Sequence, residues 1–162
     1  MFTIARHIEI DAGHRVPYHD SLCRHLHGHR WKIVAHVEAP ELVAPDPKRA
    51  DSGMVVDFGV IKRVLMDKIH NRFDHRLILW EQDALVTDIR FYRTLMNVGI
   101  GESIVTVPVI PTSEGLAKYW AELVAPELVG GAMRLAQLNV WETPNCVATY
   151  KLPRPTASIG TH

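Results

Sequence analysis

Three histidines near the N-terminus have the side-chain type and the spacing that bind a metal ion. His27 and His29 are two residues apart, so on a strand their side chains point to the same side. Residues 29–38 alternate between apolar and polar side chains, and His14 continues the apolar face of an alternating stretch that precedes it. An antiparallel return would bring His14 beside the pair. Three imidazoles from neighbouring strands are typical of a catalytic zinc site, which keeps its fourth position open for water or substrate.

Cys23 lies between these histidines, four residues before His27. Bound zinc, the imidazoles and Arg24 would each favour its thiolate, the form that acts as a base or a nucleophile. The neighbours of Cys23 are polar, whereas Cys146 lies in an apolar stretch and is interpreted as an inert core residue. Two alternatives stay open. The histidines could belong to an ordinary surface segment, or Cys23 could complete a closed structural zinc site, although such sites usually contain more cysteine.

The pattern of apolar residues predicts the elements that position this cluster. Alternation predicts strands, and apolar stripes at helical spacing predict two helices. Their order favours an α+β domain with the helices on one face of an antiparallel four-stranded sheet. The expected elements are strands over 2–14 and 29–38, a loop over 40–53, a helix capped by Asp57 and ending near residue 72, a helix after Pro111-Thr112, and a hairpin pairing 133–142 with 146–151.

Two segments carry weaker patterns. Residues 81–110 are hard to assign: two glycines indicate a turn, and residues 104–110 could form a strand. Residues 153–162 contain two prolines and small polar side chains without periodicity, so we expect a mobile C-terminal tail.

The composition of the chain excludes some classes of function. The 162 residues are enough for one domain with a real core, which we place at residues 1–152. Eighteen Lys plus Arg balance eighteen Asp plus Glu, so no basic field suggests nucleic acid or an anionic membrane as a partner. The N-terminus alternates and contains charge, so neither a signal peptide nor a membrane span is expected. Two cysteines without a secretory signal favour a reducing, cytoplasmic location.

Several short strings resemble one enzyme family. CRHLHGH (residues 23–29) follows AGHR (residues 12–15), and MVVDFGVIK, FDH, PTSE and WET come later in the family's order. Together they resemble the 6-pyruvoyltetrahydropterin synthase and 6-carboxytetrahydropterin synthase family over residues 4–150. The resemblance implies the tunnelling fold, in which sheets from three subunits close into a barrel and two trimers stack as a homohexamer.

The resemblance also implies a role for each site residue. A carboxylate beside an imidazole fixes its tautomer and raises its basicity, and a carboxylate in an apolar row needs a partner. The alternatives are an ordinary helix-end pair for the Asp-His dipeptide and a simple helix cap for PTSE. The implied roles are zinc ligands at His14, His27 and His29, a catalytic thiol at Cys23, a proton-shuttling pair at Asp74 and His75, a carboxylate that grips the pterin ring at Glu142, and pocket-lining residues at Thr112, Ser113 and Glu114.

The implied substrate is 7,8-dihydroneopterin triphosphate, which loses triphosphate by elimination. Elimination and rearrangement alone give 6-pyruvoyltetrahydropterin, whereas additional release of acetaldehyde gives 6-carboxytetrahydropterin on the route to queuosine. The three residues between Cys23 and His27 resemble the short bacterial form of this loop, which favours the carboxy product. A non-catalytic zinc-binding assembly module and a zinc hydrolase acting on a purine or pterin ring remain as alternatives. Candidates for holding the triphosphate are Arg15, Arg24, Arg30 and Lys32.

The sequence departs from the family pattern at two places. Residues 81–110 make a longer segment between FDH and PTSE than the family usually has. Ile78-Leu79 stand where an Asn-bearing turn is common. Neither departure touches the zinc ligands.

Overall fold

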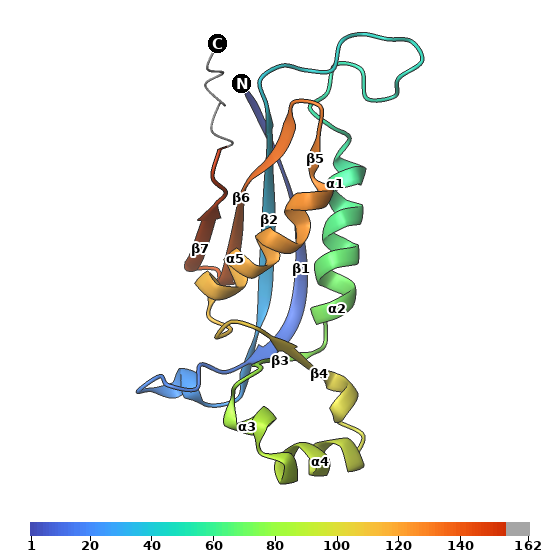
Figure 1. Cartoon of the computed structure of the whole chain (residues 1–162). Coiled ribbons are helices and arrows are strands. Elements are labelled where there is room, and N and C mark those ends of the chain that lie inside the picture. Colours follow the sequence, from blue (N-terminus) through green and yellow to red (C-terminus); the bar gives the residue numbers. More distant parts are fainter. Residues whose placement is uncertain (155–162) are drawn as a thin grey trace, which may run out of the picture.

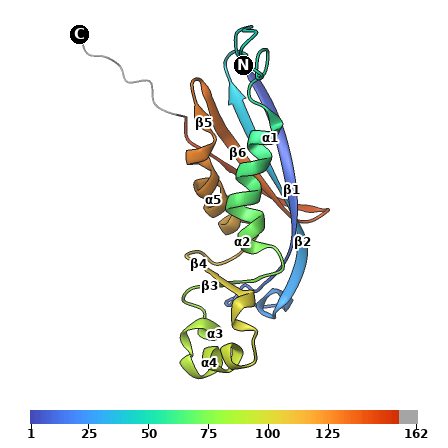
Figure 2. The ribbon, with the colours of Figure 1, turned by 90° about the vertical axis from the view of Figure 1, so that its right-hand side faces the viewer.

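The computed structural model describes residues 1–154 of the chain (Figure 1). A long twisted sheet is covered on one face by helices, and a small helical unit extends from one end (Figures 1 and 2). The expected tail at residues 153–162 lies outside the described residues apart from Pro153 and Arg154. Among residues 1–154, no helix is long and apolar enough to cross a membrane.

Four strands form the central part of the sheet, and each is antiparallel to the next of these four. They are β1 (Phe2–His14), β2 (His27–Ala39), β6 (Met133–Thr143) and β7 (Cys146–Lys151). The alternating patterns therefore predict these strands correctly, and β2 begins two residues earlier than the pattern indicates. The β1–β2 register opposes Ile8 to Ile33 and His14 to His27, so the apolar faces of the two strands coincide.

The complete sheet is mixed and seven-stranded, which corrects the expectation of four antiparallel strands. Two short strands, β3 (Leu77–Trp80) and β4 (Ile104–Val107), add parallel pairs at the end of β1, and β5 (Val129–Gly130) pairs with β6. Strand β3 is a short apolar run buried at its centre, so it has no alternation that could reveal it. Strand β4 ends at Val107, before Pro108, which has no N–H to donate.

Two helical stretches cover the same face of the sheet, as predicted (Figure 2). The first consists of α1 (Phe58–Leu65), a π-helical turn η2 (Met66–His70) and α2 (Asn71–Phe73), and the Asp57 carboxylate caps it by accepting from the N–H of Gly59. The second consists of α5 (Ser113–Val124) and the turn η4 (Ala125–Glu127). Both begin at the predicted positions, and the first ends close to the predicted residue 72.

The hydrophobic core lies between these helices and the sheet. Trp31 of β2, Trp120 of α5 and Phe73 of α2 are fully buried, and their rings pack edge to face, with centroids 6.3 Å apart for the two tryptophans. Trp31 follows His29 by two residues on β2, and the centroids of their rings are 5.5 Å apart. Packing at the core therefore supports the end of the sheet that carries the histidines.

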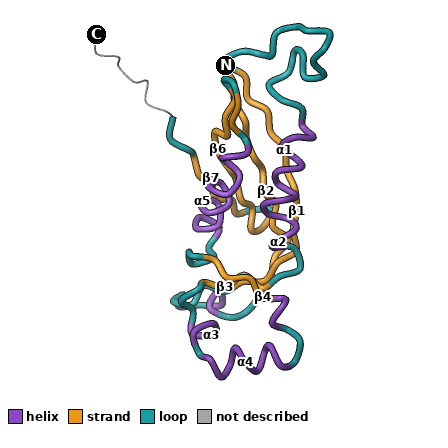
Figure 3. Tube along the Cα trace, turned by 45° about the vertical axis from the view of Figure 1, so that its right-hand side comes forward, coloured by secondary structure: helices purple, strands orange, loops and turns teal. Residues whose placement is uncertain are grey.

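The segment that the sequence left unassigned forms a separate helical unit beyond β3 and β4 (Figure 3). It contains α3 (Ala84–Thr87), α4 (Ile89–Asn97) and the turn η3 (Gly101–Ser103), and neither α3 nor α4 buries a residue. Parallel strands need a crossover connection, and residues 81–103 supply it between β3 and β4. We refer to residues 81–103 as the crossover segment.

Candidate active site

The β1–β2 ladder brings the three histidines together. In the register of the two strands His14 lies opposite His27, and Ala12 lies opposite His29. Ala12 is the residue before His14 on the same face of β1. One side-chain ligand atom from each histidine and one from Glu142 lie within 4.8 Å of one another. The convergence predicted from strand parity is therefore present, with Glu142 of β6 as an additional member. We call these four residues the His–Glu cluster.

Backbone carbonyls orient two of the imidazoles. The Nδ1 of His14 lies 2.7 Å from the carbonyl oxygen of Pro111, and the Nδ1 of His27 lies 2.8 Å from that of His25. A carbonyl can only accept, so each Nδ1 carries the proton and each Nε2 presents a lone pair. The Nε2 atoms of His14 and His29 are buried without a hydrogen-bond partner. Orphaned, buried lone pairs on converging imidazoles fit a zinc ion.

Burial favours the neutral form of the His14 and His29 imidazoles. Desolvation is the largest influence on the pKa of His14 and lowers it, in spite of the bond to Pro111. Desolvation also lowers the pKa of His29, against the opposing effect of the Glu142 carboxylate. Metal binding requires neutral imidazole, so the fold holds both side chains in the form that can act as a ligand.

Glu142 lies beside the histidines and also lines a cavity. Its Oε1 is 3.1 Å from the Nε2 of His29 and 3.6 Å from that of His14. A cavity of about 630 Å³ is lined by Glu142 and His29 together with Arg30, Lys32 and Trp141. The carboxylate can therefore reach either a metal ion or a molecule in the cavity, and its expected contact with the pterin ring stays a prediction.

Cys23 lies outside the His–Glu cluster. It is half-buried in the 3₁₀ turn η1 (Leu22–Arg24), within the connection that joins His14 to His27. Its thiol is free, so it is not committed to a disulfide. Cys146 is also free but exposed, which corrects the expectation of a core position. It begins β7 next to the hairpin turn, where alternation turns Ala148 inward and Cys146 outward.

Asp74 and His75 form a hydrogen-bonded pair. The Nδ1 of His75 lies 2.8 Å from a carboxylate oxygen of Asp74, whose other oxygen accepts from the backbone N–H of Asp11 at 2.9 Å. Burial acts to raise the pKa of Asp74, but the bonds from Asp11 and His75 outweigh it, so the pKa is lowered. His75 itself has a φ of 57°, and its imidazole is 80% exposed.

This Asp-His pair lies outside the His–Glu cluster. His75 borders a second cavity, of about 470 Å³, whose lining also includes Asp11, His29, Arg30 and Arg76. The Asp11 and Arg30 side chains, joined by two hydrogen bonds, alternate with the inward residues of β1 and β2 and therefore point away from the helices. The fold thus brings Asp74 and His75 to each other, and neither residue belongs to the His–Glu cluster.

The PTSE segment adjoins the cluster through its proline. Pro111 orients His14, and the next residue, Thr112, caps α5 by accepting from the N–H of Gly115 at 3.1 Å. The capping alternative is thus confirmed for Thr112. Ser113 and Glu114 occupy the first turn of α5, so they start from the same end of the helix as the carbonyl that holds His14.

The four basic candidates have different surroundings. Arg15 forms an ion pair with buried Asp83, and Arg30 pairs with Asp11. Lys32 and Arg30 line the cavity next to Glu142, whereas Arg24 is exposed on η1. Arg30 and Lys32 are therefore the two that border the larger cavity.

Sequence reasoning missed the groups that orient the ligands. The carbonyls of Pro111 and His25 act through the backbone, and every residue type has a carbonyl, so residue types carry no signal for them. The closeness of Glu142 to the imidazoles depends on the β2–β6 register, which sequence periodicity leaves undetermined.

An α+β fold whose mixed sheet gathers three histidines and a carboxylate beside a cavity defines a candidate metal site. The model of the 6-pyruvoyl tetrahydropterin synthase family matches residues 3–153, and the chain belongs to that family. A 6-carboxy-5,6,7,8-tetrahydropterin synthase of Rickettsia felis is 35% identical over 147 residues, covering 90% of this chain and 97% of the relative. A protein of the same description from Synechocystis is 29% identical over 155 residues, covering 95% of this chain and 96% of the relative.

Solved structures share the fold. A crystal structure of an uncharacterised protein from Wolinella succinogenes superimposes with a TM-score of 0.74 at 24% identity, covering 93% of this chain and 97% of that one. The 6-pyruvoyl tetrahydropterin synthase of Caenorhabditis elegans gives a TM-score of 0.61 at 23% identity, covering 94% and 96%. These likenesses support the fold assignment.

Proposed function

We propose that the chain is a 6-carboxy-5,6,7,8-tetrahydropterin synthase. This lyase converts 7,8-dihydroneopterin triphosphate into 6-carboxytetrahydropterin, acetaldehyde and triphosphate, as in queuosine biosynthesis. The observation that carries the proposal is the His–Glu cluster, in a chain that shares 35% identity over nearly the full length of a relative with that description. The same cluster in an unrelated chain would support only a metal site.

The chain's own residues supply a distinct function at each position. His14, His27 and His29 would hold zinc, which when bound polarises the oxygens of the substrate side chain and stabilises negative charge that develops on them. Cys23 lies in the connection between the two strands that carry the histidines, and it would act as a base that removes a C–H proton from the substrate. Ionised Asp74 holds the Nδ1 proton of His75, which leaves Nε2 free to accept or return a proton.

Recognition of the pterin ring falls to acceptor groups near the cluster. Glu142 can accept two hydrogen bonds from an amino-pyrimidinone edge, and it borders the larger cavity. Thr112, Ser113 and Glu114 would line the pocket from the start of α5, where free backbone N–H groups favour acceptor-rich groups. Arg30 and Lys32 are positioned to attract the triphosphate to that cavity.

A homohexamer of two stacked trimers would complete this site. Within one chain, Asp74 and His75 are not members of the His–Glu cluster, and in the proposed assembly a neighbouring chain would supply the pair. Light scattering coupled to size-exclusion chromatography should give a mass six times the 18.3 kDa of the chain. A monomer that is fully active would contradict this assembly.

Product analysis tests the reaction. Purified zinc-loaded protein is incubated with 7,8-dihydroneopterin triphosphate, and the products are identified by mass spectrometry, with acetaldehyde trapped as its hydrazone. We expect 6-carboxytetrahydropterin and acetaldehyde in equal amounts. Formation of 6-pyruvoyltetrahydropterin without acetaldehyde would instead support the pyruvoyl synthase, the activity after which the matched family is named.

Two further arms separate the other classes. Incubation with GTP followed by detection of formate would reveal a ring-opening hydrolase. Stoichiometric zinc without turnover of any pterin would point to a non-catalytic assembly module.

A further inference from the structure

One buried carboxylate lies outside the site described above. Among the described residues, His14 and Asp83 are the polar or charged residues classed as buried, and Asp83 is 1% exposed. Asp83 belongs to the first residues of the crossover segment, just before α3. A buried carboxylate is costly unless it is paired, so its partner indicates what the burial achieves.

The partner is a residue adjacent to a histidine of the cluster. The Nε of Arg15 donates to Oδ2 of Asp83 at 2.7 Å, while Oδ1 accepts from the N–H of Leu85 at 2.8 Å and caps α3. Asp83 is in turn held by a bond from its own N–H to the carbonyl of Trp80, at the end of β3. The crossover segment is therefore tied to the chain immediately after His14.

The same connection reaches Cys23. Residues 15–26 run from His14 to His27, and Val16 donates its N–H to the carbonyl of Cys23 at 2.8 Å. Arg15 and Val16 are consecutive in the chain. The ion pair between Arg15 and Asp83 therefore also holds the N–H group of Val16, which donates to the carbonyl of Cys23.

Few other contacts fix this connection. The turn η1 buries no residue, and Tyr18, Leu22 and Leu26 are exposed. The ring of Tyr18, on this connection, packs against that of Trp80 with centroids 5.9 Å apart, and Trp80 is the last residue of β3, directly before the crossover segment. A stretch with little buried surface opens readily unless specific bonds hold it.

We propose that Asp83, acting through Arg15, is a positioning residue for Cys23. The buried carboxylate fixes Arg15, and the adjacent Val16 holds the carbonyl of Cys23. Together these bonds keep the thiol in its place in the connection between His14 and His27. The importance of that place for turnover rests on the proposed function. This assigns a purpose to the first residues of the crossover segment.

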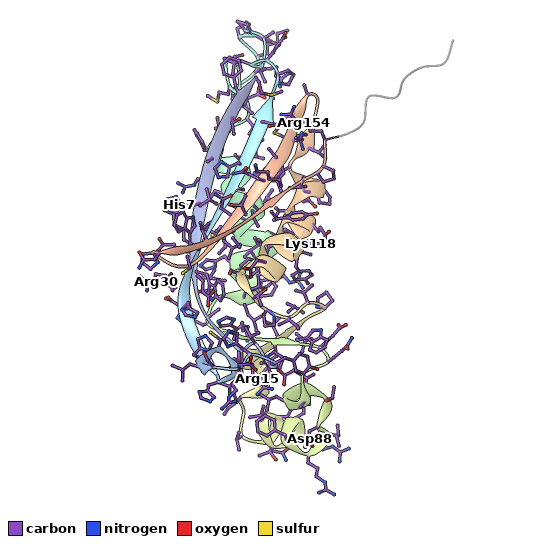
Figure 4. The ribbon with its side chains drawn as sticks, turned by 90° about the vertical axis from the view of Figure 1, so that its left-hand side faces the viewer. His7, Arg15, Arg30, Asp88, Lys118 and Arg154 are labelled. Atoms are coloured by element: carbon purple, nitrogen blue, oxygen red, sulfur yellow. The ribbon has the colours of Figure 1, made fainter. Side chains whose placement is uncertain are left out.

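The chain contains a matched control at Asp88. Its carboxylate caps α4 by accepting from the N–H groups of Arg90 and Phe91, just as Asp83 caps α3, but no bond joins it to residues 15–26. Figure 4 shows Arg15 where the sheet meets the helical unit and Asp88 farther out in that unit. Any change in helix capping is therefore common to substitutions at both positions, and loss of the charged partner of Arg15 is specific to Asp83.

The test compares Asp83→Asn with Asp88→Asn in a Cys146→Ser background, so that iodoacetamide labels Cys23 alone. Asparagine keeps the shape and an oxygen that can cap the helix but removes the charge. We expect Asp83→Asn to raise the alkylation rate of Cys23 about tenfold and to lower kcat by about 10- to 100-fold with KM changed little. Asp88→Asn should leave both unchanged. Zinc content should stay at one ion per chain in both variants.

A second variant keeps the proposal testable if Asp83→Asn folds poorly. Tyr18→Leu replaces an exposed side chain and should shift the alkylation rate in the same direction by a smaller factor. Equal alkylation rates in the parent, Asp83→Asn and Tyr18→Leu would overturn the proposal, and so would equal changes in Asp83→Asn and Asp88→Asn. If the parent fails to turn over the pterin triphosphate while the alkylation difference persists, the positioning stands and the proposed function fails.

Discussion

At the scale of single residues, the site depends on which atom of each imidazole faces inward. Backbone carbonyls at Pro111 and His25 hold the Nδ1 protons, and burial keeps His14 neutral. The free Nε2 atoms then converge with Glu142. A ligand set of this kind is specified less by residue types than by the few backbone groups that orient them.

The first residue-scale prediction separates binding from catalysis. Cys23→Ala should retain one zinc ion per chain, because Cys23 lies outside the His–Glu cluster. Its turnover should fall by about 10²–10⁴-fold, the usual effect of removing a general base. Metal content by plasma emission spectroscopy and product formation by mass spectrometry check the two halves. Cys146→Ser, at an exposed position, serves as the control and should keep full activity. Full activity of Cys23→Ala would exclude the thiol as a base.

A second prediction concerns His36, on the sheet face without helices. Burial lowers the pKa of His36, and its Nε2 has no hydrogen-bond partner. In the unfolded chain the imidazole takes up a proton as the pH falls through its ordinary value of 6.5, but in the folded chain it does so only at lower pH. The free energy of unfolding should therefore decrease as the pH falls below 6.5 towards the lowered pKa, and His36→Gln should remove this part of the decrease.

Urea denaturation of parent and His36→Gln over about pH 5 to 8 measures this difference. His7→Gln is the control, since His7 is an exposed residue of the neighbouring strand β1 (Figure 4). A gap between parent and His36→Gln that stays constant with pH would contradict the prediction.

At the scale of elements, the start of α5 links the helix to the metal ligands. Gly115 lies so close to the carbonyl of Ile110 that an added Cβ would collide with it. Ile110 immediately precedes Pro111, whose carbonyl orients His14. Glycine at position 115 is thus required by a close backbone approach, and the approach sets where the helix meets the cluster.

Gly115→Ala should lower the free energy of unfolding by about 1–3 kcal/mol, as overpacking does. It should also weaken zinc binding, since the Pro111 carbonyl must move. Gly130→Ala is the matched control, because its Cβ would meet only the Met133 side chain, at 4.0 Å. Denaturation midpoints and a competitive zinc titration test both statements. A stability loss without any change in zinc affinity would show that α5 and the cluster are independent.

The crossover segment shows where element prediction failed. Strand β3, which leads into it, is only four residues long and buried at the centre, so neither alternation nor helical spacing is present. Helix α4 has an amphipathic pattern but buries no residue. The two helices of the core, in contrast, begin at capping residues Asp57 and Thr112 and carry apolar stripes, and both were predicted.

At the scale of the whole molecule, the metal should couple to global stability. A ligand that binds only the folded state adds about 2.7 kcal/mol when present at 100 times its dissociation constant. Removing zinc with a chelator should therefore lower the melting temperature of the parent, and added zinc should restore it. In His14→Gln, which lacks one ligand, the chelator should have little effect. An identical response of parent and variant would place the metal elsewhere.

The whole molecule also sets the limits of what sequence patterns could predict. Residue types and strand periodicity determined the three-histidine cluster, the four long strands and the two core helices, because each of these follows from short-range spacing. Only the tertiary structure decided that Glu142 lies beside the imidazoles, that Asp74 and His75 lie outside this group, and that Asp83 is tied to Arg15. These depend on register and on contacts between segments far apart in the chain, and the same local sequence is compatible with many such arrangements.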